Sequence, residues 1–149
     1  MDIGTESSWP SAALSNFSAH SFVFRDVQCA SMEGLLQSFK FSSPEEQFLV
    51  CALVGKKAKF KGKKKKWFLS QTLFWQGHEI DRHSEEFQSM LDEAFESMFS
   101  QCEAARSALL ATGNALLIHS MGKADPSMTV LTEQEFVSRL TRIRAKLQT

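Results

Sequence analysis

The longest helical pattern in this chain begins at Ser84 and sets the first constraint on the fold. Apolar residues recur after it at i, i+3, i+4 and i+7, the spacing that gathers side chains on one face of a helix. The members of this stripe are Phe87, Met90, Leu91, Ala94, Phe95, Met98 and Phe99. The pattern predicts a long helix with its apolar face in the core. Asp92, Glu93 and Glu96 lie on the other face, which we interpret as solvated.

Capping residues predict further helices on both sides of this one. Ser43 to Glu46 combine an N-cap serine, a proline at the first helical position and a glutamate three residues after the cap. That helix is predicted to end at Gly55, with Phe48, Leu49, Ala52 and Leu53 facing inward. Thr132 to Glu135 form a second capping box, which opens a helix with Phe136, Val137, Leu140, Ile143 and Leu147 on one side. Another helix is predicted from Cys102 to Thr112, ending at Gly113.

Strand patterns are short and fewer. Residues 22–24 and 27–29 flank Arg25-Asp26 and suggest a hairpin. The aromatic stretch 68–75 fits a strand or a short buried helix, and periodicity does not choose between them. Residues 115–119 are apolar and predict a buried strand. The expected fold is α+β, predominantly helical, with two or three short strands.

Length and composition indicate one ordinary globular domain. A chain of 149 residues with 43% hydrophobic and 23% charged residues can bury a substantial core. We expect residues 1–13 to form a loose arm and residues 14–149 to form the domain. The sequence shows no run of 18 apolar residues and no signal-peptide pattern, so a cytoplasmic protein without membrane contact is expected. Its three cysteines and four histidines lack metal-binding spacing, so no metal ion or other cofactor is expected.

The formal net charge of zero hides a strong local polarity. Eight lysines lie between Lys56 and Lys66, whereas residues 79–103 hold eight acidic residues and one arginine. Gly62 and mutual repulsion argue against a stable helix here, so we predict a loop or a frayed helix. The run has two readings. It is either a solubilising surface, or a site for phosphates and a polynucleotide backbone, with Phe60 and Trp67 stacking beside it.

Residues 31–40 combine an anchored helix face with reactive side chains. Met32, Leu35, Leu36 and Phe39 follow the apolar helical spacing, and Glu33, Gln37 and Lys40 share the other face. An acid, an amide and an amine on one rigid frame suit acid–base or nucleophilic chemistry. For the helix taken alone, a solvated charged face is the plainer interpretation.

The order of several short motifs resembles the NADAR family, the YbiA-like N-glycosidases. Ser15-Asn16-Phe17 is followed by Ser-x-Glu-x-x-x-Gln-x-x-Lys, which begins at Ser31. Ala58-Lys59 with Gly62, Trp67, and Leu109 to Asn114 continue the resemblance, which runs to about Leu117. The resemblance implies a compact YbiA-like domain and cleavage of an N-glycosidic bond without a metal.

The resemblance also implies roles for individual residues. Glu33 corresponds to the central catalytic carboxylate, and Lys40 to an essential lysine that acts as a nucleophile or as a phosphate-binding cation. Gln37 would orient Glu33 or a sugar hydroxyl. Further substrate contacts are expected from Asn16, Phe17, Lys59, Trp67, His119 and Asp125.

Several of these contacts have structural alternatives. Asn16 also suits an ordinary turn, and Phe17 and Trp67 also suit the core. His119 stands where many relatives have glutamate, and it serves either in proton transfer or as a core histidine. The Trp-Gly pair that relatives often carry near this position is missing, which leaves the identity of the substrate open.

The implied substrates carry ribose joined to a nucleobase-like group. Removal of ADP-ribose from guanine in nucleic acid is the first expectation, because a polymeric anion gains more from a long lysine run than one phosphate does. Hydrolysis of the ribosylamine intermediates of riboflavin synthesis, which are small phosphorylated substrates, is the alternative. A third possibility is a binding module for ADP-ribose or nucleic acid that has lost turnover.

Overall fold

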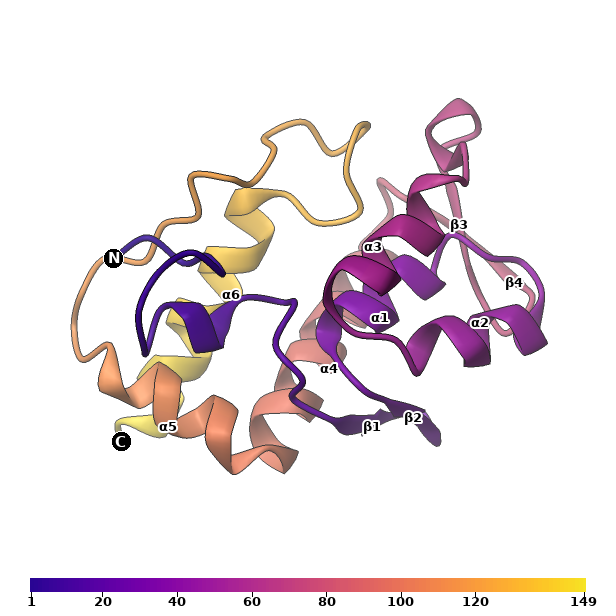
Figure 1. Ribbon diagram of the computed structural model, residues 1–149. Coiled ribbons are helices and arrows are strands. Elements are labelled where there is room, and N and C mark those ends of the chain that lie inside the picture. Colours follow the sequence, from indigo (N-terminus) through magenta and orange to yellow (C-terminus); the bar gives the residue numbers. More distant parts are fainter.

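Helix α4 (Glu85–Gln101) lies at the middle of the fold (Figure 1). The structure is a computed structural model that describes residues 1–149. Helix α4 packs against β1 (Phe22–Phe24), β4 (His78–Asp81), α1 (Met32–Ser38), α5 (Glu103–Ala111) and α6 (Glu133–Leu147). All seven members of its predicted apolar stripe are buried. The sequence pattern is confirmed, and this helix is the wall against which the other elements pack.

Two groups of elements flank α4 in Figure 1. One group contains α1, α2 (Pro44–Cys51), α3 (Gly55–Lys63), the turn η2 (Trp67–Leu69) and the hairpin of β3 (Thr72–Trp75) with β4. The other contains α5, α6 and the N-terminal segment with η1 (Ala12–Leu14). β1 pairs with β2 (Val27–Cys29) in a second antiparallel hairpin, Phe22 opposite Cys29. The α+β, mainly helical, single-domain fold is confirmed.

The predicted helix starts and the first hairpin are also confirmed. The hydroxyl oxygens of Ser43, Ser84 and Thr132 each accept a hydrogen bond from the backbone N–H three residues later. The hairpin turn holds Arg25 and Asp26 at φ angles of 47° and 68°, which a two-residue turn of matching twist requires. Neither residue is the glycine or asparagine that usually marks such a turn.

Helix α2 presents a different face to the core from the one predicted. Phe48 and Leu49 are 56% and 64% exposed, whereas Gln47 and Val50 are fully buried. The Gln47 amide nitrogen donates to the carbonyl oxygens of Ser38 and Phe74 at 3.0 and 2.8 Å, and its oxygen accepts from the Gln76 N–H at 2.8 Å. The hydrogen bonds of the buried Gln47 side chain set which face of α2 points to the core, because buried backbone groups need hydrogen-bond partners.

The lysine run forms helix α3, not the predicted loop or frayed helix. Its small residues Ala58 and Gly62 are buried against α1, so the lysines point away from the core and remain hydrated. Gly55 does adopt the left-handed φ of 55° expected of a helix stop, but α2 has already ended at Cys51, and Gly55 opens α3 instead. The stretch 68–75 is divided: residues 72–75 form strand β3, whereas residues 68–69 belong to the 3-10 turn η2.

The chain termini differ most from expectation. Residues 115–119 form no regular strand; only Ile118 makes an isolated bridge, with Asp2. Residues 1–13, expected as a loose arm, supply this partner, and Ile3 is fully buried in the core. The N-terminal amine donates to the Leu116 carbonyl oxygen at 2.6 Å. None of the helices is both long enough and apolar enough to cross a membrane.

Candidate functional site

Helix α1 is fixed at its N-terminus by a tight contact with the end of α2. The Ser31 hydroxyl accepts from the Gly34 N–H at 3.0 Å and donates to the Leu53 carbonyl oxygen at 2.9 Å. A Cβ atom at Gly34 would lie only 2.6 Å from that same oxygen. Glycine is therefore required here, and the first turn of α1 cannot shift relative to α2.

The first turn of α1 carries Glu33, and its side chain is held by Gln37. The Gln37 amide nitrogen donates to a Glu33 carboxylate oxygen at 2.7 Å, which confirms that these residues share one face. Burial raises the pKa of the Glu33 carboxyl, and the Gln37 hydrogen bond and nearby positive charges oppose that shift. Glu33 is therefore poised to exchange a proton nearer to neutral pH than an exposed glutamate.

The side chain of Gln37 is itself confined by helix α3. A Cβ atom at Gly62 would overlap the Gln37 amide oxygen, so only glycine leaves room for this rotamer. That oxygen is buried and has no hydrogen-bond partner within the chain. The contact links the lysine helix to the Glu33 carboxylate through the Gln37 side chain.

Lys40 follows α1 and lies partly buried near Glu33. Burial, opposed by the negative charge of Glu33, lowers the pKa of the Lys40 ammonium to about 8. No direct ion pair joins the two side chains, although each influences the pKa of the other. An amine of this pKa is neutral in about one molecule in ten at pH 7, which gives it nucleophilic character.

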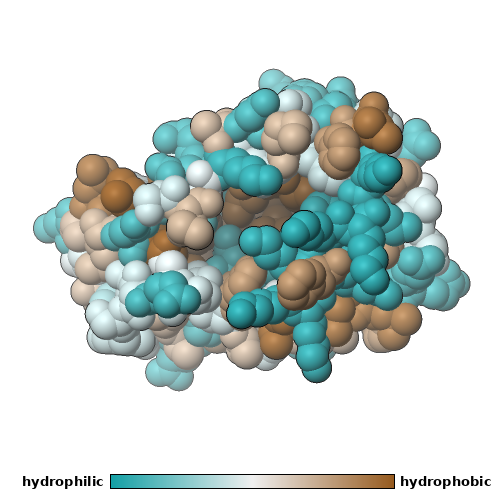
Figure 2. Space-filling view, turned by 45° about the horizontal axis from the view of Figure 1, so that its top comes forward, coloured by the Kyte–Doolittle hydropathy of each residue, from teal (hydrophilic) through white to brown (hydrophobic).

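Positive groups from two other segments surround this pair. Lys59 of α3 and His119 oppose the rise in the pKa of Glu33, and Lys123 lowers the pKa of Lys40 further. His119 and Lys123 belong to the segment before α6, whereas Glu33, Lys40 and Lys59 come from the α1–α3 group. Figure 2 shows a hollow between these two parts of the molecule, with a mostly hydrophilic rim and apolar atoms at its floor. The candidate site faces this boundary.

The N-terminal segment orients His119. The His119 Nδ1 lies 2.7 Å from the Ile3 carbonyl oxygen. A carbonyl oxygen can only accept, so Nδ1 is the protonated donor of this hydrogen bond. Nε2 makes no hydrogen bond within the chain. The ring packs edge-on against Phe136, with centroids 5.4 Å apart. A Cβ at Gly122 would lie 2.8 Å from the His119 ring, so this position also needs glycine. The sequence did not foresee this role for residues 1–13.

Asn16 and Phe17 lie beside the start of α1. The Asn16 carbonyl oxygen accepts from the Glu33 N–H at 3.0 Å, while its side-chain amide makes no hydrogen bond within the chain. The Lys59 ammonium lies 5.9 Å from the centroid of the Phe17 ring. The structure thus brings Asn16, Phe17 and Lys59 to the region of Glu33, and their contact with a substrate remains a prediction.

Trp67 and Asp125 are placed differently. Trp67 is 7% exposed and belongs to the hydrophobic core. Asp125 is exposed, and its carboxylate accepts from the Ser127 N–H and hydroxyl at 2.9 and 2.8 Å, which lowers its pKa. The charge acting on it comes from His83, and Asp125 is not among the groups that influence Glu33 or Lys40. Lys123, which does influence Lys40, was missed, because nothing in its local sequence marks it.

Comparison with known proteins places the chain in a family. A family model described as bacteriophage protein GP30.3 matches residues 8–145. The chain belongs to the bacteriophage protein GP30.3 family. One relative, an uncharacterized 17.1 kDa protein in the Gp30–rIII intergenic region of Enterobacteria phage T4, is 32% identical over 149 residues. That match spans 99% of this chain and 98% of the relative.

The fold of this GP30.3-family protein is that of YbiA. The NMR structure of E. coli YbiA is similar with a TM-score of 0.66 over 99% of this chain and 84% of that one. The sequences are 19% identical, so the likeness shows the fold alone. The YbiA-like fold implied by the motifs of α1 is confirmed.

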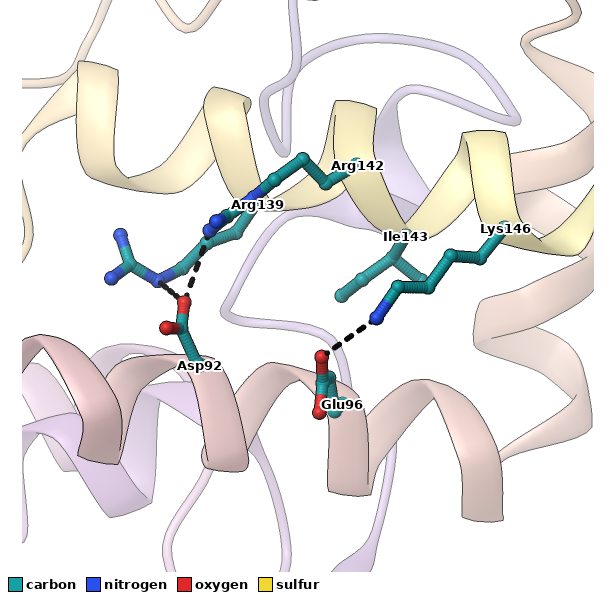
Figure 3. A pocket seen from close by; sticks show the side chains of 6 residues that line it. All are labelled: Asp92, Glu96, Arg139, Arg142, Ile143 and Lys146. Carbon is teal, nitrogen blue, oxygen red and sulfur yellow. Dashed lines mark hydrogen bonds and ion pairs between the residues drawn. The ribbon is translucent and has the colours of Figure 1, made fainter.

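Two surface cavities of the GP30.3-family protein lie away from this site. One lies between α4 and α6, where Asp92 pairs with Arg139 and Arg142 at 2.9 and 3.0 Å, and Glu96 with Lys146 at 3.2 Å (Figure 3). Every charged side chain that lines it is engaged in an ion pair across the helix interface, which suits packing more than catalysis. The second is a shallow apolar groove of about 450 Å³ beside α2, with no ionisable pair. No three His, Cys, Asp or Glu side chains gather closely enough to hold a metal ion.

The contact between Gly62 and Gln37 predicts how a substitution at Gly62 changes the free energy of unfolding. The size of this change depends on the residue at position 37. Gly62→Ala is expected to destabilise the GP30.3-family protein by about 1–3 kcal/mol, because overpacking against Gln37 outweighs the better helix propensity of alanine. In a Gln37→Ala background the same substitution is expected to destabilise much less, since the amide group is gone and only the Cβ of residue 37 remains, 3.0 Å from the added methyl. Urea denaturation of the four proteins of this cycle measures the effect. Gly4→Ala, where the nearest atom is 3.9 Å away, is the control. Equal effects of Gly62→Ala in both backgrounds would refute the contact.

Proposed function

We propose that this protein is an N-glycosidase that cleaves the bond between a ribose and a nucleobase-like group. The observation that carries the proposal is the Glu33–Lys40 pair: a partly buried carboxylate held by Gln37 beside a lysine whose pKa is lowered to about 8. Such a pair supplies a proton-transfer group and an amine nucleophile within one site. The YbiA-like fold and the family motif on α1 support the same activity.

The reaction proceeds through covalent attachment of the sugar to Lys40. The neutral amine attacks the anomeric carbon, the C–N bond breaks with its electron pair passing to the base nitrogen, and that nitrogen takes up a proton. Glu33 stabilises the positive charge that develops on the sugar ring and carries the proton released by the Lys40 nitrogen. Opening of the ring, with protonation of the ring oxygen, leaves a Schiff base on Lys40. Water then adds to it and releases the sugar.

The positively charged side chains around the site bind the phosphate groups of the substrate. Lys59 and Lys123, which come from two different segments of the chain, act on Glu33 or Lys40. Cations in this arrangement favour a ribose that carries phosphate, as both ADP-ribose and ribose 5-phosphate do. ADP-ribose attached to guanine is the substrate that we propose first. Ribosylamines of the riboflavin pathway are the alternative.

Incubation of the purified protein with defined substrates tests this proposal. ADP-ribosylated guanosine is expected to yield unmodified guanosine and free ADP-ribose, separated by liquid chromatography. A riboflavin-pathway ribosylamine phosphate is the parallel substrate, and its cleavage in place of the first would reassign the substrate within the same activity. Binding of ADP-ribose without cleavage of either substrate would show a binding module and refute the N-glycosidase.

The lowered pKa of Lys40 predicts the pH dependence of the reaction. Since only the neutral amine attacks, kcat/KM is expected to rise about tenfold per pH unit below pH 8 and to level off above it. The direction follows from the sign of the shift, because the neutral fraction grows as the pH rises through the pKa. Initial rates between pH 6 and 10 measure the profile. A rate independent of pH over this range would contradict an amine nucleophile of this pKa.

A further inference from the structure

The charges of helix α3 differ from the other charged surfaces of the protein in having no partners. None of the eight lysines between Lys56 and Lys66 forms an ion pair, and no acidic residue occurs from residue 47 to residue 78. All eight are exposed. Three of the four cations of α6, by contrast, pair with carboxylates of α4. Eight neighbouring charges without ion-pair partners produce a strongly positive local potential, which attracts anions.

The helix also displays an aromatic ring in the middle of this field. Ala58 and Gly62 are buried against α1, and at 3.6 residues per turn Phe60 projects from the opposite side. The same geometry places Lys56 and Lys63 on one side of Phe60, and Lys57 and Lys64 on the other. Phe60 is 61% exposed, and Phe68, just after the run, is 42% exposed. Exposed rings interleaved with cations are the arrangement that single-stranded nucleic acid binds, through stacking and phosphate contact.

This surface is continuous with the candidate site. Lys59 belongs to α3 and acts on both Glu33 and Lys40. Gly62, on the buried face of the same helix, confines the Gln37 side chain that holds Glu33. Around the helix Lys59 lies between the exposed Phe60 and the buried Gly62, so a strand on the exposed face of α3 reaches the candidate site by way of Lys59.

We propose that α3 and the lysines after it form a docking surface for single-stranded nucleic acid, which leads a modified base of that strand to Glu33 and Lys40. The surface rests on the charge and ring placement alone, and its role in catalysis rests on the proposed N-glycosidase function. A lipid membrane is a different partner for lysines and exposed apolar residues. The rings here lie among the lysines, however, and not on a separate apolar face, which an interfacial helix requires.

Fluorescence anisotropy with a labelled, unmodified DNA strand of about 20 nucleotides tests the surface at several salt concentrations. The triple variant Lys57→Gln/Lys61→Gln/Lys64→Gln is expected to bind at least about tenfold more weakly, with the slope of log K against log salt reduced by about 2. Phe60→Ala is expected to weaken binding about tenfold through lost stacking, with little change in the slope. None of these residues belongs to the catalytic pair or its supports, so cleavage of ADP-ribosylated guanosine stays at the wild-type rate.

Matched controls separate the surface from net charge and general exposure. Arg25→Gln/Arg142→Gln/Lys146→Gln removes the same number of charges from other faces, and Phe48→Ala removes an exposed ring from α2. Neither is expected to change DNA binding. Equal losses in the α3 triple variant and its control, or tighter binding to duplex DNA or to phosphatidylserine vesicles than to the single strand, would overturn the proposal. Cleavage of the nucleoside without DNA binding would refute the surface alone. DNA binding without cleavage of any substrate would refute the N-glycosidase alone.

Discussion

Glu33→Gln is expected to fold like the wild-type protein and to reduce turnover about a thousandfold or more. The substitution keeps the size of the side chain and an oxygen that can accept the 2.7 Å hydrogen bond from Gln37. It removes the negative charge that stabilises the developing positive charge on the sugar. Since burial already disfavours that charge, stability is expected to stay the same or to rise slightly.

The rate on ADP-ribosylated guanosine and the thermal unfolding midpoint measure the two halves of this prediction. Glu79→Gln is the matched control, because Glu79 is exposed on β4, forms no ion pair and should keep the full rate. A folded Glu33→Gln protein with wild-type turnover would remove this carboxylate from the mechanism.

Lys40→Arg is expected to be inactive although it retains the positive charge. A guanidinium does not lose its proton near neutral pH and cannot attack the anomeric carbon, so kcat is expected to fall by about three orders of magnitude or more. The steady-state rate, together with the Kd for ADP-ribose, measures the effect. The binding of ADP-ribose should change little, because the charge is still present.

The matched control for Lys40→Arg is Lys57→Arg, the same substitution on the exposed face of α3. It is expected to leave both quantities unchanged. If Lys40→Arg kept its turnover and lost affinity, Lys40 would be a phosphate clamp, and Glu33 would have to activate water directly.

Helices of the fold were predictable from the sequence where one helix face or one cap carries the signal. The stripe from Phe87 to Phe99 fixed the central helix, and the caps at Ser43, Ser84 and Thr132 fixed three helix starts. These signals are local, because a cap needs only its own first turn and a stripe needs only its own residues.

The mistaken predictions concern contacts that one segment cannot reveal. Gly62 and the repulsion between lysines argued against a helix in the lysine run, but Ala58 and Gly62 form a packing face whose Gly62 fits against Gln37 of α1. The orientation of α2 depends on the carbonyl oxygens that Gln47 reaches in other segments. Packing partners and buried hydrogen bonds overrode the apolar count in both cases.

The candidate site also contains some residues that the sequence grouped and others that only the fold brings together. Glu33 and Gln37 lie on one short helix and Lys40 follows two residues after its end, so their spacing and a resemblance were enough to group them. Lys123 and the Ile3 carbonyl that orients His119 come from segments without a motif, and only the folded chain brings them to α1. Trp67, which belongs to the family motif, is buried in the hydrophobic core.

Borohydride trapping during turnover tests the central claim most directly, because it joins the activity to the residue in one experiment. Reduction makes a Schiff base permanent, and mass spectrometry of the digested protein locates it. With ADP-ribosylated guanosine as substrate, the account predicts release of unmodified guanosine and one sugar adduct, on Lys40, that is absent from Glu33→Gln and Lys40→Arg. Release of guanosine with no adduct, or with an adduct on another lysine, would contradict it.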